Sequence, residues 1–277
     1  MKSTLLKGVD SVPPAALEKF TNSLTNIVSQ RLTTNSEARK GYLRFSNMGT
    51  PCERKLWYEI NAPEDKEELS ADVILKFLYG DIIEAFILLL AEVSGHRVEG
   101  NQDRVELEGV VGHRDAIIDG VVVDVKSASS YSYKKFAEGR LGDDDPFGYI
   151  PQLQGYLKAG EEDELVTDKT RAAFLPVDKT LGHFCLDFHE KQDWDWKGIL
   201  DHKKEILAQP EPPERAFDPE PMGKSGNMKL GMFCSYCAFK EKCYPELRTF
   251  IYSTGPVFLT DVKKTPDVYE VVKDETN

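Results

Sequence analysis

The chain has 277 residues, of which 40% are hydrophobic and 30% charged, a composition that is ordinary for a globular protein of one large domain or two small ones. Its formal net charge of −12 argues against a protein that coats nucleic acid by bulk electrostatic attraction, although local basic groups would still permit a nuclease. The longest apolar run, 82–93, is interrupted by Glu84 and Glu92, so we expect no transmembrane helix and a cytoplasmic protein of a bacterial or phage-infected cell.

The predicted elements are helices and strands joined by short polar segments. Helices are expected from apolar spacing, and from the capping residue Ser70, at 17–32, 53–58, 70–95, 150–159 and 193–208. Strands are expected over 97–126, 171–177 and 183–188, with turns at Gly109 and at Asp119-Gly120. The loops and linkers are 41–51, 63–68, 139–148 and 209–221. This order predicts an α/β fold with a mixed sheet flanked by helices.

The most informative segment is a predicted β-hairpin with Asp119-Gly120 at its turn. Asp-Gly between two β-branched runs favours a two-residue type I′ turn, which fixes the register of the two strands. In that register Asp115 lies opposite Asp124, and Lys126 shares their face of the sheet. The opposite face is apolar and predicts a core surface: Ala116, Ile118, Val121, Val123 and Val125.

Two carboxylates in directly opposed positions repel each other, because their Cβ atoms lie roughly 4.5–5.5 Å apart. Asp115 and Asp124 are therefore either solvated at a sheet edge or neutralised by a divalent cation such as Mg²⁺ or Mn²⁺. Lys126 beside them can hold or deprotonate an attacking water, or stabilise charge that builds on a phosphate.

A third carboxylate, Glu84, stands in a predicted helix that is apolar nearly all round. A carboxylate in such a helix either pairs with a buried cation from Arg or Lys or binds a metal. Gly80, one turn earlier, leaves space on the same face. Gln152 and Tyr156 are four residues apart and share one helix face, a pattern that ordinary surface residues also show.

In this order, the motifs Gly80-x-x-x-Glu84, Gly112-x-x-Asp115, Asp124-x-Lys126 and Gln152-x-x-x-Tyr156 resemble the RecB-family branch of the PD-(D/E)XK nucleases. Cys52 upstream and Cys234-x-x-Cys237-x-x-x-x-x-Cys243 downstream resemble its iron–sulfur members, such as AddB and the CRISPR-associated and phage-encoded RecB-like exonucleases. The resemblance implies a restriction-endonuclease-like core with a helical N-terminus and a C-terminal Fe–S cap. It divides the chain into a helical segment (1–40), a nuclease domain (41–250) and a tail (251–277).

The resemblance also implies roles for individual residues. Glu84, Asp115 and Asp124 would bind Mg²⁺ or Mn²⁺ together with the carbonyl of Val125. Lys126 would position the nucleophilic water, while the catalytic motif residues Gln152 and Tyr156 would contact DNA or brace the site. Two departures from the family pattern are Glu84, where many relatives have His, and Asp124, where Glu is common.

The cysteine spacing differs from that of a zinc ribbon and of the ferredoxins. Cys52, Cys234, Cys237 and Cys243 would hold a 4Fe–4S cluster if the family resemblance holds, with zinc as the alternative. Either site would have a structural role, because it would close a very long loop. The fifth cysteine, Cys185, lies in an alternating segment and is expected to be a small core residue of a strand.

Local basic and aromatic side chains are candidates for DNA binding: Arg54, Tyr131, Lys134 and Lys135. The sequence thus predicts a DNA exonuclease acting on single strands or ends in recombination, repair or replication, with recombination or CRISPR-adaptation proteins as its partners. A non-catalytic Fe–S DNA-binding or assembly factor on the same fold is the alternative. An acidic DNA mimic would use the net charge but would leave the cysteines unexplained.

Overall fold

In a computed structural model, residues 12–32, 41–69 and 71–271 are described, and the chain divides into two compact units. Unit 1 comprises 1–37, 43–49 and 70–200, and unit 2 comprises 38–42, 50–69 and 201–277. The predicted boundaries at 40 and 250 do not separate these units. Ser70, the expected N-cap, lies outside the described residues. No helix within the described ranges is long and apolar enough to cross a membrane.

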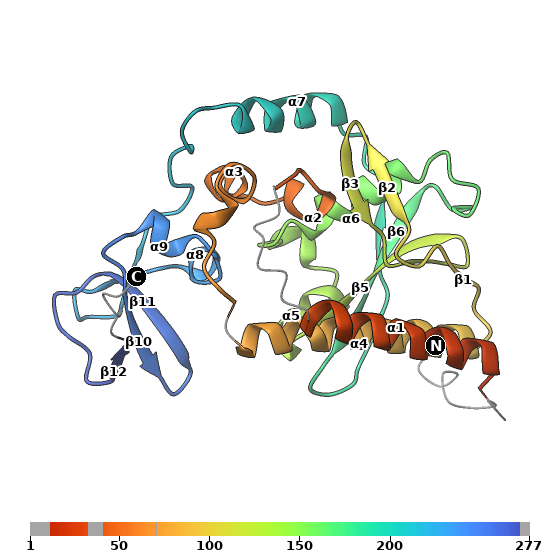
Figure 1. Cartoon of the computed structure of the whole chain (residues 1–277), viewed down its shortest axis with the longest axis horizontal. Helices are drawn as coiled ribbons and strands as arrows, with labels where there is room; N and C mark the ends of the chain where they lie inside the picture. The colour runs from red at the N-terminus through yellow and green to blue at the C-terminus, as the bar shows by residue number, and fades with distance from the viewer. Residues whose placement is uncertain (1–11, 33–40, 70, 272–277) are drawn as a thin grey trace. The chain divides into compact units, whose positions relative to one another are not determined.

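Unit 1 combines helices with a five-stranded sheet and a separate two-stranded hairpin (Figure 1). Its helices are α1 (Pro14–Leu32), α2 (Phe45–Met48), α4 (Ala71–Val93), α5 (Ser130–Ala137), the 3-10 turn η2 (Leu141–Asp143) and α6 (Tyr149–Ala159). Its strands are β1 (Val98–Glu99), β2 (Arg104–Leu107), β3 (Val110–His113), β4 (Ala116–Ile118), β5 (Val121–Ala128), β6 (Arg171–Asp178) and β7 (Asp187–Glu190). A further helix, α7 (Trp196–Leu207), begins in unit 1 and ends in unit 2.

The five-stranded sheet has the order β1-β4-β5-β6-β7 and is mixed, as the sequence predicts. Only β5 and β6 run parallel, and the crossover between them contains α5 and α6. The other neighbouring pairs are antiparallel. This confirms an α/β architecture in which helices flank a mixed sheet.

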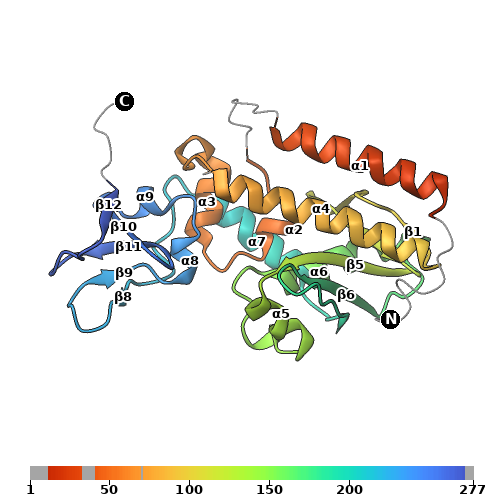
Figure 2. The same ribbon diagram turned by 90° about the horizontal axis from the view of Figure 1, so that it is seen from below.

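Helices cover both faces of this sheet, because β5 alternates its side chains between two apolar clusters. On one face, Ile87 and Leu88 of α4 pack against Val123 of β5, and Figure 2 shows α4 running along the sheet. On the other face, Leu153 of α6 packs against Val122 of β5. Burial on both faces leaves few places for a charge, so the charged residues of β5 must be compensated locally.

The first helix lies along the fourth in both views (Figures 1 and 2). Phe20 of α1 and Phe86 of α4 have ring centroids 6.2 Å apart. At the end of α1, Arg31 donates two hydrogen bonds to the carboxylate of Asp81, of 2.6 and 2.9 Å. The predicted N-terminal helix is confirmed as part of unit 1.

The hairpin register that the sequence predicts is confirmed. Ile118 pairs with Val121, and the ladder continues outward to Ala116 and Val123. Asp119 and Gly120 have φ angles of 51° and 84°, so both turn residues are in the left-handed region that a type I′ turn requires.

Unit 2 contains a second five-stranded sheet of order β12-β10-β11-β9-β8. Its helices are α3 (Glu53–Asn61), the 3-10 turn η1 (Pro63–Asp65), α8 (Met232–Ser235) and α9 (Lys240–Cys243). Its strands are β8 (Glu220–Pro221), β9 (Met228–Lys229), β10 (Arg248–Tyr252), β11 (Gly255–Asp261) and β12 (Tyr269–Val271). The expected tail, 251–277, is therefore wrong for the residues up to 271, since Phe250 and Leu259 are buried between these strands and give them a core.

The strand predicted over 183–188 is also wrong in its bounds. Pairing with β6 begins at Asp187, which lies opposite Phe174. Before that point Phe184 makes a single bridge to Val177, and Cys185 lies outside any strand. Cys185 is still partly buried and packs against the core of unit 1, as expected.

Candidate functional site

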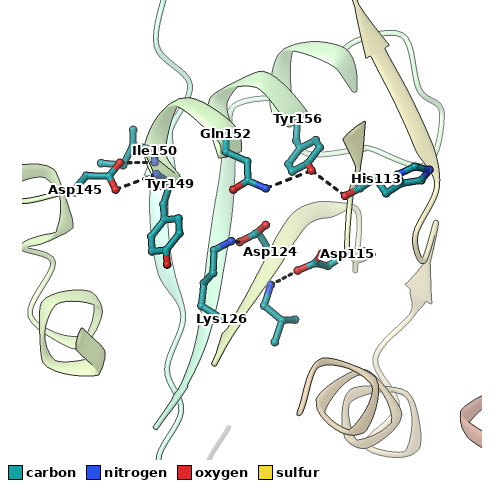
Figure 3. A network of polar contacts seen from close by, with 10 residues as sticks. His113, Asp115, Asp124, Lys126, Asp145, Tyr149, Ile150, Gln152 and Tyr156 are labelled. Carbon is teal, nitrogen blue, oxygen red and sulfur yellow. Dashed lines mark hydrogen bonds and ion pairs between the residues drawn. The ribbon is translucent and has the colours of Figure 1, made fainter. Parts of the chain in front are cut away.

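The predicted carboxylates of the hairpin lie side by side in unit 1 (Figure 3). Continuing the ladder by one residue beyond Ala116 and Val123 places Asp115 opposite Asp124. The side chain of Asp124 is 2% exposed, and its Oδ2 atom lies 2.5 Å from Nζ of Lys126. Among the described residues, this buried oxygen has no hydrogen bond of regular geometry, so the ion pair with Lys126 is its compensation.

Asp115 is held by the backbone of the neighbouring strand. Its Oδ2 atom accepts a hydrogen bond of 2.7 Å from the N–H of Val125. Burial raises the pKa of Asp115 well above its ordinary value, and the charges of Asp124 and Glu84 raise it further. Asp115, Asp124 and Glu84 therefore share one electrostatic environment, as the sequence predicts for three convergent acids.

Glu84 reaches this environment from α4. Burial raises the pKa of Glu84 from 4.5 to about 7, and the nearby charges of Asp124 and Asp81 act in the same direction. A hydrogen bond of 2.7 Å from Nε2 of Gln102 to Oε1 of Glu84 opposes the rise. A pKa near 7 places Glu84 close to the midpoint of its ionisation at neutral pH. A cation that comes near would therefore shift it towards the charged form.

Lys126 is a cation enclosed by acids and aromatic rings. Burial alone would lower the pKa of its ammonium, but the charges of Asp124 and Asp115 outweigh burial and raise it. Nζ lies 4.6 Å from the ring centroid of Tyr149 and 5.9 Å from that of Phe174. The charges of Asp124 and Asp115 therefore favour the protonated form of Lys126.

The motif residues of α6 brace the end of β3, two residues before Asp115. The hydroxyl of Tyr156 donates a hydrogen bond of 2.8 Å to the carbonyl of His113, and Nε2 of Gln152 donates one of 3.3 Å to the same hydroxyl. Gly112 permits this approach, because a Cβ atom there would lie 3.0 Å from the Tyr156 ring and 2.6 Å from Phe45. Tyr156 is buried, so the bracing role is the one that its position supports.

Gly80 lies on α4 where an added Cβ would come 3.9 Å from Ser127, which is ordinary van der Waals contact. A glycine is thus not needed there for the packing of α4 on β5. The expectation that it leaves space for a ligand stays a prediction.

Four residues that the sequence analysis did not select complete the site. Arg114, with a side chain only 2% exposed, forms ion pairs with Asp103 and Asp163. Asp145 accepts hydrogen bonds from two N–H groups at the start of α6. The other two are Gln102 and Tyr149. Asp145 lies three residues before Gly148, the N-cap of α6, so the usual capping signal does not mark it, and the other three depend on tertiary contacts.

The residues proposed for DNA binding divide between the two units. On α5 of unit 1, Tyr131 is 72% exposed and Lys134 is exposed, while Lys135 pairs with Asp144 and lies 5.4 Å from the Tyr131 ring. In unit 2, Nη1 of Arg54 donates a hydrogen bond of 2.6 Å to the carbonyl of Pro213, and Nη2 bonds to the hydroxyl of Tyr58. Arg54 therefore serves the internal packing of unit 2.

The four cysteines of the predicted cluster all belong to unit 2. Burial raises the pKa of the Cys234 thiol to about 11, and the thiols of Cys237, Cys52 and Cys243 act in the same direction, so the four are neighbours. Burial likewise raises the pKa of Cys237 to about 11. The chemistry of four adjacent thiols suits a soft metal, which would have to displace their protons.

Neither group of donors is arranged as a finished metal site. Within 12–32, 41–69 and 71–271, no three His, Cys, Asp or Glu side chains are placed so that they could hold a metal ion. The donor chemistry nonetheless fits a cation at the carboxylates, where the buried oxygen of Asp124 has only the ion pair with Lys126.

No protein-family model and no curated protein matches the chain. Among solved structures, the crystal structure of SSO0001 is similar to it, with 15% sequence identity over 80% of this chain and 95% of that one and a TM-score of 0.43. A similarity of this extent does not identify a family. The function must therefore be argued from the site itself.

Proposed function

We propose that the chain is a metal-dependent deoxyribonuclease of the RecB-like PD-(D/E)XK type that degrades DNA from its ends. The observation that carries the proposal is the register of β4 on β5, which places Asp115, the residue before β4, beside Asp124 of β5, with Lys126 paired to Asp124. Three buried or half-buried ionisable groups at one point of a sheet lower the stability of the fold. A reaction that these groups serve would explain why they are there.

The residues that would hold Mg²⁺ or Mn²⁺ are Glu84, Asp115 and Asp124, with the carbonyl of Val125 as a further ligand. When bound, such a cation supplies a nucleophilic water and stabilises charge on the scissile phosphate. Burial and, after it, repulsion between the neighbouring acids raise the pKa of Glu84 and of Asp115, and a bound cation would relieve both effects by stabilising the ionised forms.

Lys126 contributes a positive charge that is fixed at the site. Its raised pKa keeps the ammonium protonated, so it can orient a water by donating a hydrogen bond and can stabilise a phosphate oxygen. The ring of Tyr149, 4.6 Å from Nζ, limits the directions that the ammonium can take. Tyr156 and Gln152 hold the end of β3, two residues before Asp115, in place.

A basic and aromatic surface on α5 is the proposed contact for the DNA backbone. Tyr131 presents an exposed ring for stacking on a base, and Lys134 presents an exposed ammonium for a phosphate. Nζ of Lys135 lies 5.4 Å from the centroid of the Tyr131 ring. Arg54 is left out of this surface because its guanidinium is engaged by Pro213 and Tyr58.

Cys52, Cys234, Cys237 and Cys243 would hold the 4Fe–4S cluster, with zinc as the alternative occupant. Their neighbouring, partly buried thiols support a shared metal. Arg215 and Lys55 lower the pKa of Cys234 and Cys237 respectively and so favour the thiolate forms that ligation needs. The group would link α3 to α8 and α9 within unit 2.

The proposal is tested by incubating the purified protein with end-labelled single- and double-stranded DNA in Mg²⁺, in Mn²⁺ and in EDTA. We expect cleavage that proceeds from the ends, requires either cation and stops in EDTA. Lys126→Ala should lower the rate by at least about a hundredfold, a loss typical of a group that stabilises transition-state charge. Lys169→Ala, which removes an exposed lysine of unit 1 outside the site, is the matched control.

A non-catalytic DNA-binding or assembly factor is the second candidate, and one observation favours it. The ion pair of Lys126 with Asp124 already compensates the most buried acid, as in a structural charge pair. In that case the wild type would bind DNA but leave labelled ends intact under every cation condition. Cleavage that Lys126→Ala abolishes would exclude this candidate.

A further inference from the structure

The turn between β1 and β2 reaches two of the proposed metal-binding residues at once. Through its side chain, Gln102 donates a hydrogen bond of 2.7 Å to Oε1 of Glu84. Through its backbone N–H, it donates one of 3.3 Å to the carbonyl of Asp115. Because Glu84 comes from α4 and Asp115 from the hairpin, this one residue connects acids supplied by two different elements.

A buried arginine holds this turn in place. The N–H of Arg114 donates to the carbonyl of Asp103 over 3.2 Å, and the guanidinium forms ion pairs of 3.1 Å with Asp103 and 2.6 Å with Asp163. Gly100 packs directly on it, since a Cβ atom there would lie 2.8 Å from Nη2 of Arg114. The side chain of Arg114, which is only 2% exposed, therefore fixes the position of the turn.

The backbone of Gln102 adopts a conformation that residues other than glycine avoid. Its φ angle is 57°, in the left-handed region, which residues other than glycine rarely adopt. Asn101 and Gln102 form the turn, and a glycine would satisfy the backbone at the second position without strain. Strain that persists next to a functional group is a reason to look for a role of the side chain itself.

We infer that Gln102 is a positioning residue that orients the carboxylate of Glu84 for a divalent cation, an inference that rests on the proposed function. The amide engages Oε1 of Glu84 and so restricts the orientation of the whole carboxylate, Oε2 included. Hydrogen bonds to a ligand from outside the coordination sphere have this effect on metal affinity.

The experiment measures Mn²⁺ binding to the full-length protein by titration calorimetry, without DNA. In Gln102→Gly the backbone keeps its φ angle and loses only the amide, so the melting temperature should not fall. The dissociation constant for Mn²⁺ should rise about tenfold, the lower end of the range for such contacts because Gln102 is exposed. Asn101→Ala is the matched control, since the side-chain oxygen of Asn101 has no hydrogen-bond partner among the described residues.

A double-mutant cycle tells a positioning role from a general loosening of the turn. If Gln102 acts through Glu84, Gln102→Gly should not weaken Mn²⁺ binding further in a Glu84→Ala protein. An equal tenfold loss in that background would overturn the inference, as would an unchanged dissociation constant for Gln102→Gly alone. A wild type that shows no saturable Mn²⁺ binding would refute the metal site of the proposed function, and this inference with it.

Discussion

Glu84 and Asp115 lie in an environment that opposes their ionisation, because burial raises the pKa of each and the charge of Asp124 raises it further. One lysine, one amide and one backbone N–H make the direct contacts that compensate the three acids. The positive charge of Lys126 also acts on Glu84 and Asp115. A group of this kind is poised to gain stability from a cation, since binding removes the repulsion that the fold alone leaves in place.

Glu84 should make the stability of the metal-free protein depend on pH. Its folded-state pKa of about 7 exceeds the ordinary 4.5, so its contribution is complete below pH 4.5 and is lost as pH rises through 7. At 1.36 kcal/mol per unit, the free energy of unfolding should fall by at most about 3 kcal/mol between pH 4.5 and pH 8. Urea denaturation in EDTA measures the decrease.

Glu84→Gln should remove most of this pH dependence and make the protein more stable at pH 8. Glu92→Gln, which changes a glutamate of the same helix that pairs with Lys19, should leave the pH profile as it is. If the unfolding free energy depended on pH in the same way in the wild type and in Glu84→Gln, Glu84 would have its ordinary pKa in the folded protein.

Tyr156→Phe should test the brace on β3, the strand that ends two residues before Asp115. The ring keeps its contact with Phe45, at a centroid distance of 5.0 Å, while the carbonyl of His113 loses its hydrogen bond. An acceptor left unpaired near the core should cost about 1–3 kcal/mol of unfolding free energy, measured in urea. Tyr131→Phe changes an exposed hydroxyl and should have no effect. An equal loss in the two variants would show that the hydroxyl of Tyr156 does not support the strand.

At the level of elements, the sequence is most informative where a local signal determines the structure. The register of β4 and β5 could be predicted because Asp119-Gly120 specifies a type I′ turn and a one-residue slip would place Asp115 and Asp124 in the other apolar cluster. The bounds of β7 could not be predicted. The alternation of apolar and polar residues continues through Cys185, whereas the pairing of β7 with β6 begins at Asp187. Which residues of a strand find a partner is a tertiary property.

Two hairpin glycines allow the turn conformation to be separated from packing. Gly109 and Gly120 have φ angles of 83° and 84°, but a Cβ atom at Gly109 meets open space, whereas one at Gly120 lies 1.9 Å from Oγ1 of Thr167. Gly109→Ala should cost roughly 1–2 kcal/mol of unfolding free energy from backbone strain alone. Gly120→Ala should cost about 1–3 kcal/mol more, because the overlap forces the segment at Thr167 to move. If the two variants lost the same unfolding free energy in urea denaturation, the segment at Thr167 would be able to move without cost.

At the scale of the whole molecule, the sequence predicts which cysteines belong together but not the division of the chain. Cys52 and the module from Cys234 to Cys243 are far apart in sequence, and both lie in unit 2, while Cys185 lies in unit 1. The boundary at 49–50 lies within the predicted loop 41–51, but nothing local shows that the chain passes from one unit to the other there. Unit 2 depends on two distant segments, which a metal shared by the four thiols would connect.

The purified protein should contain this metal, and its removal should loosen unit 2 selectively. Anaerobically prepared protein should be brown and contain iron, because thiolate-to-iron charge transfer absorbs visible light, whereas closed-shell zinc gives no colour. Cys237→Ser should lose the colour, while Cys185→Ser, in the other unit, should keep it. A colourless protein with one bound zinc would refute the iron assignment and retain the structural link.

Hydrogen exchange read by mass spectrometry then locates the effect. In Cys237→Ser, exchange should increase in α3 and in 232–243, because these segments lose the bonds that close the long loop between them. It should stay unchanged in β5 and α6, whose protection comes from the apolar clusters of unit 1. An increase spread evenly over both units would show that the cysteines stabilise the whole chain as one cooperative body. If hydrogen exchange increased in neither unit, the four thiols would bind no metal that the fold of unit 2 requires.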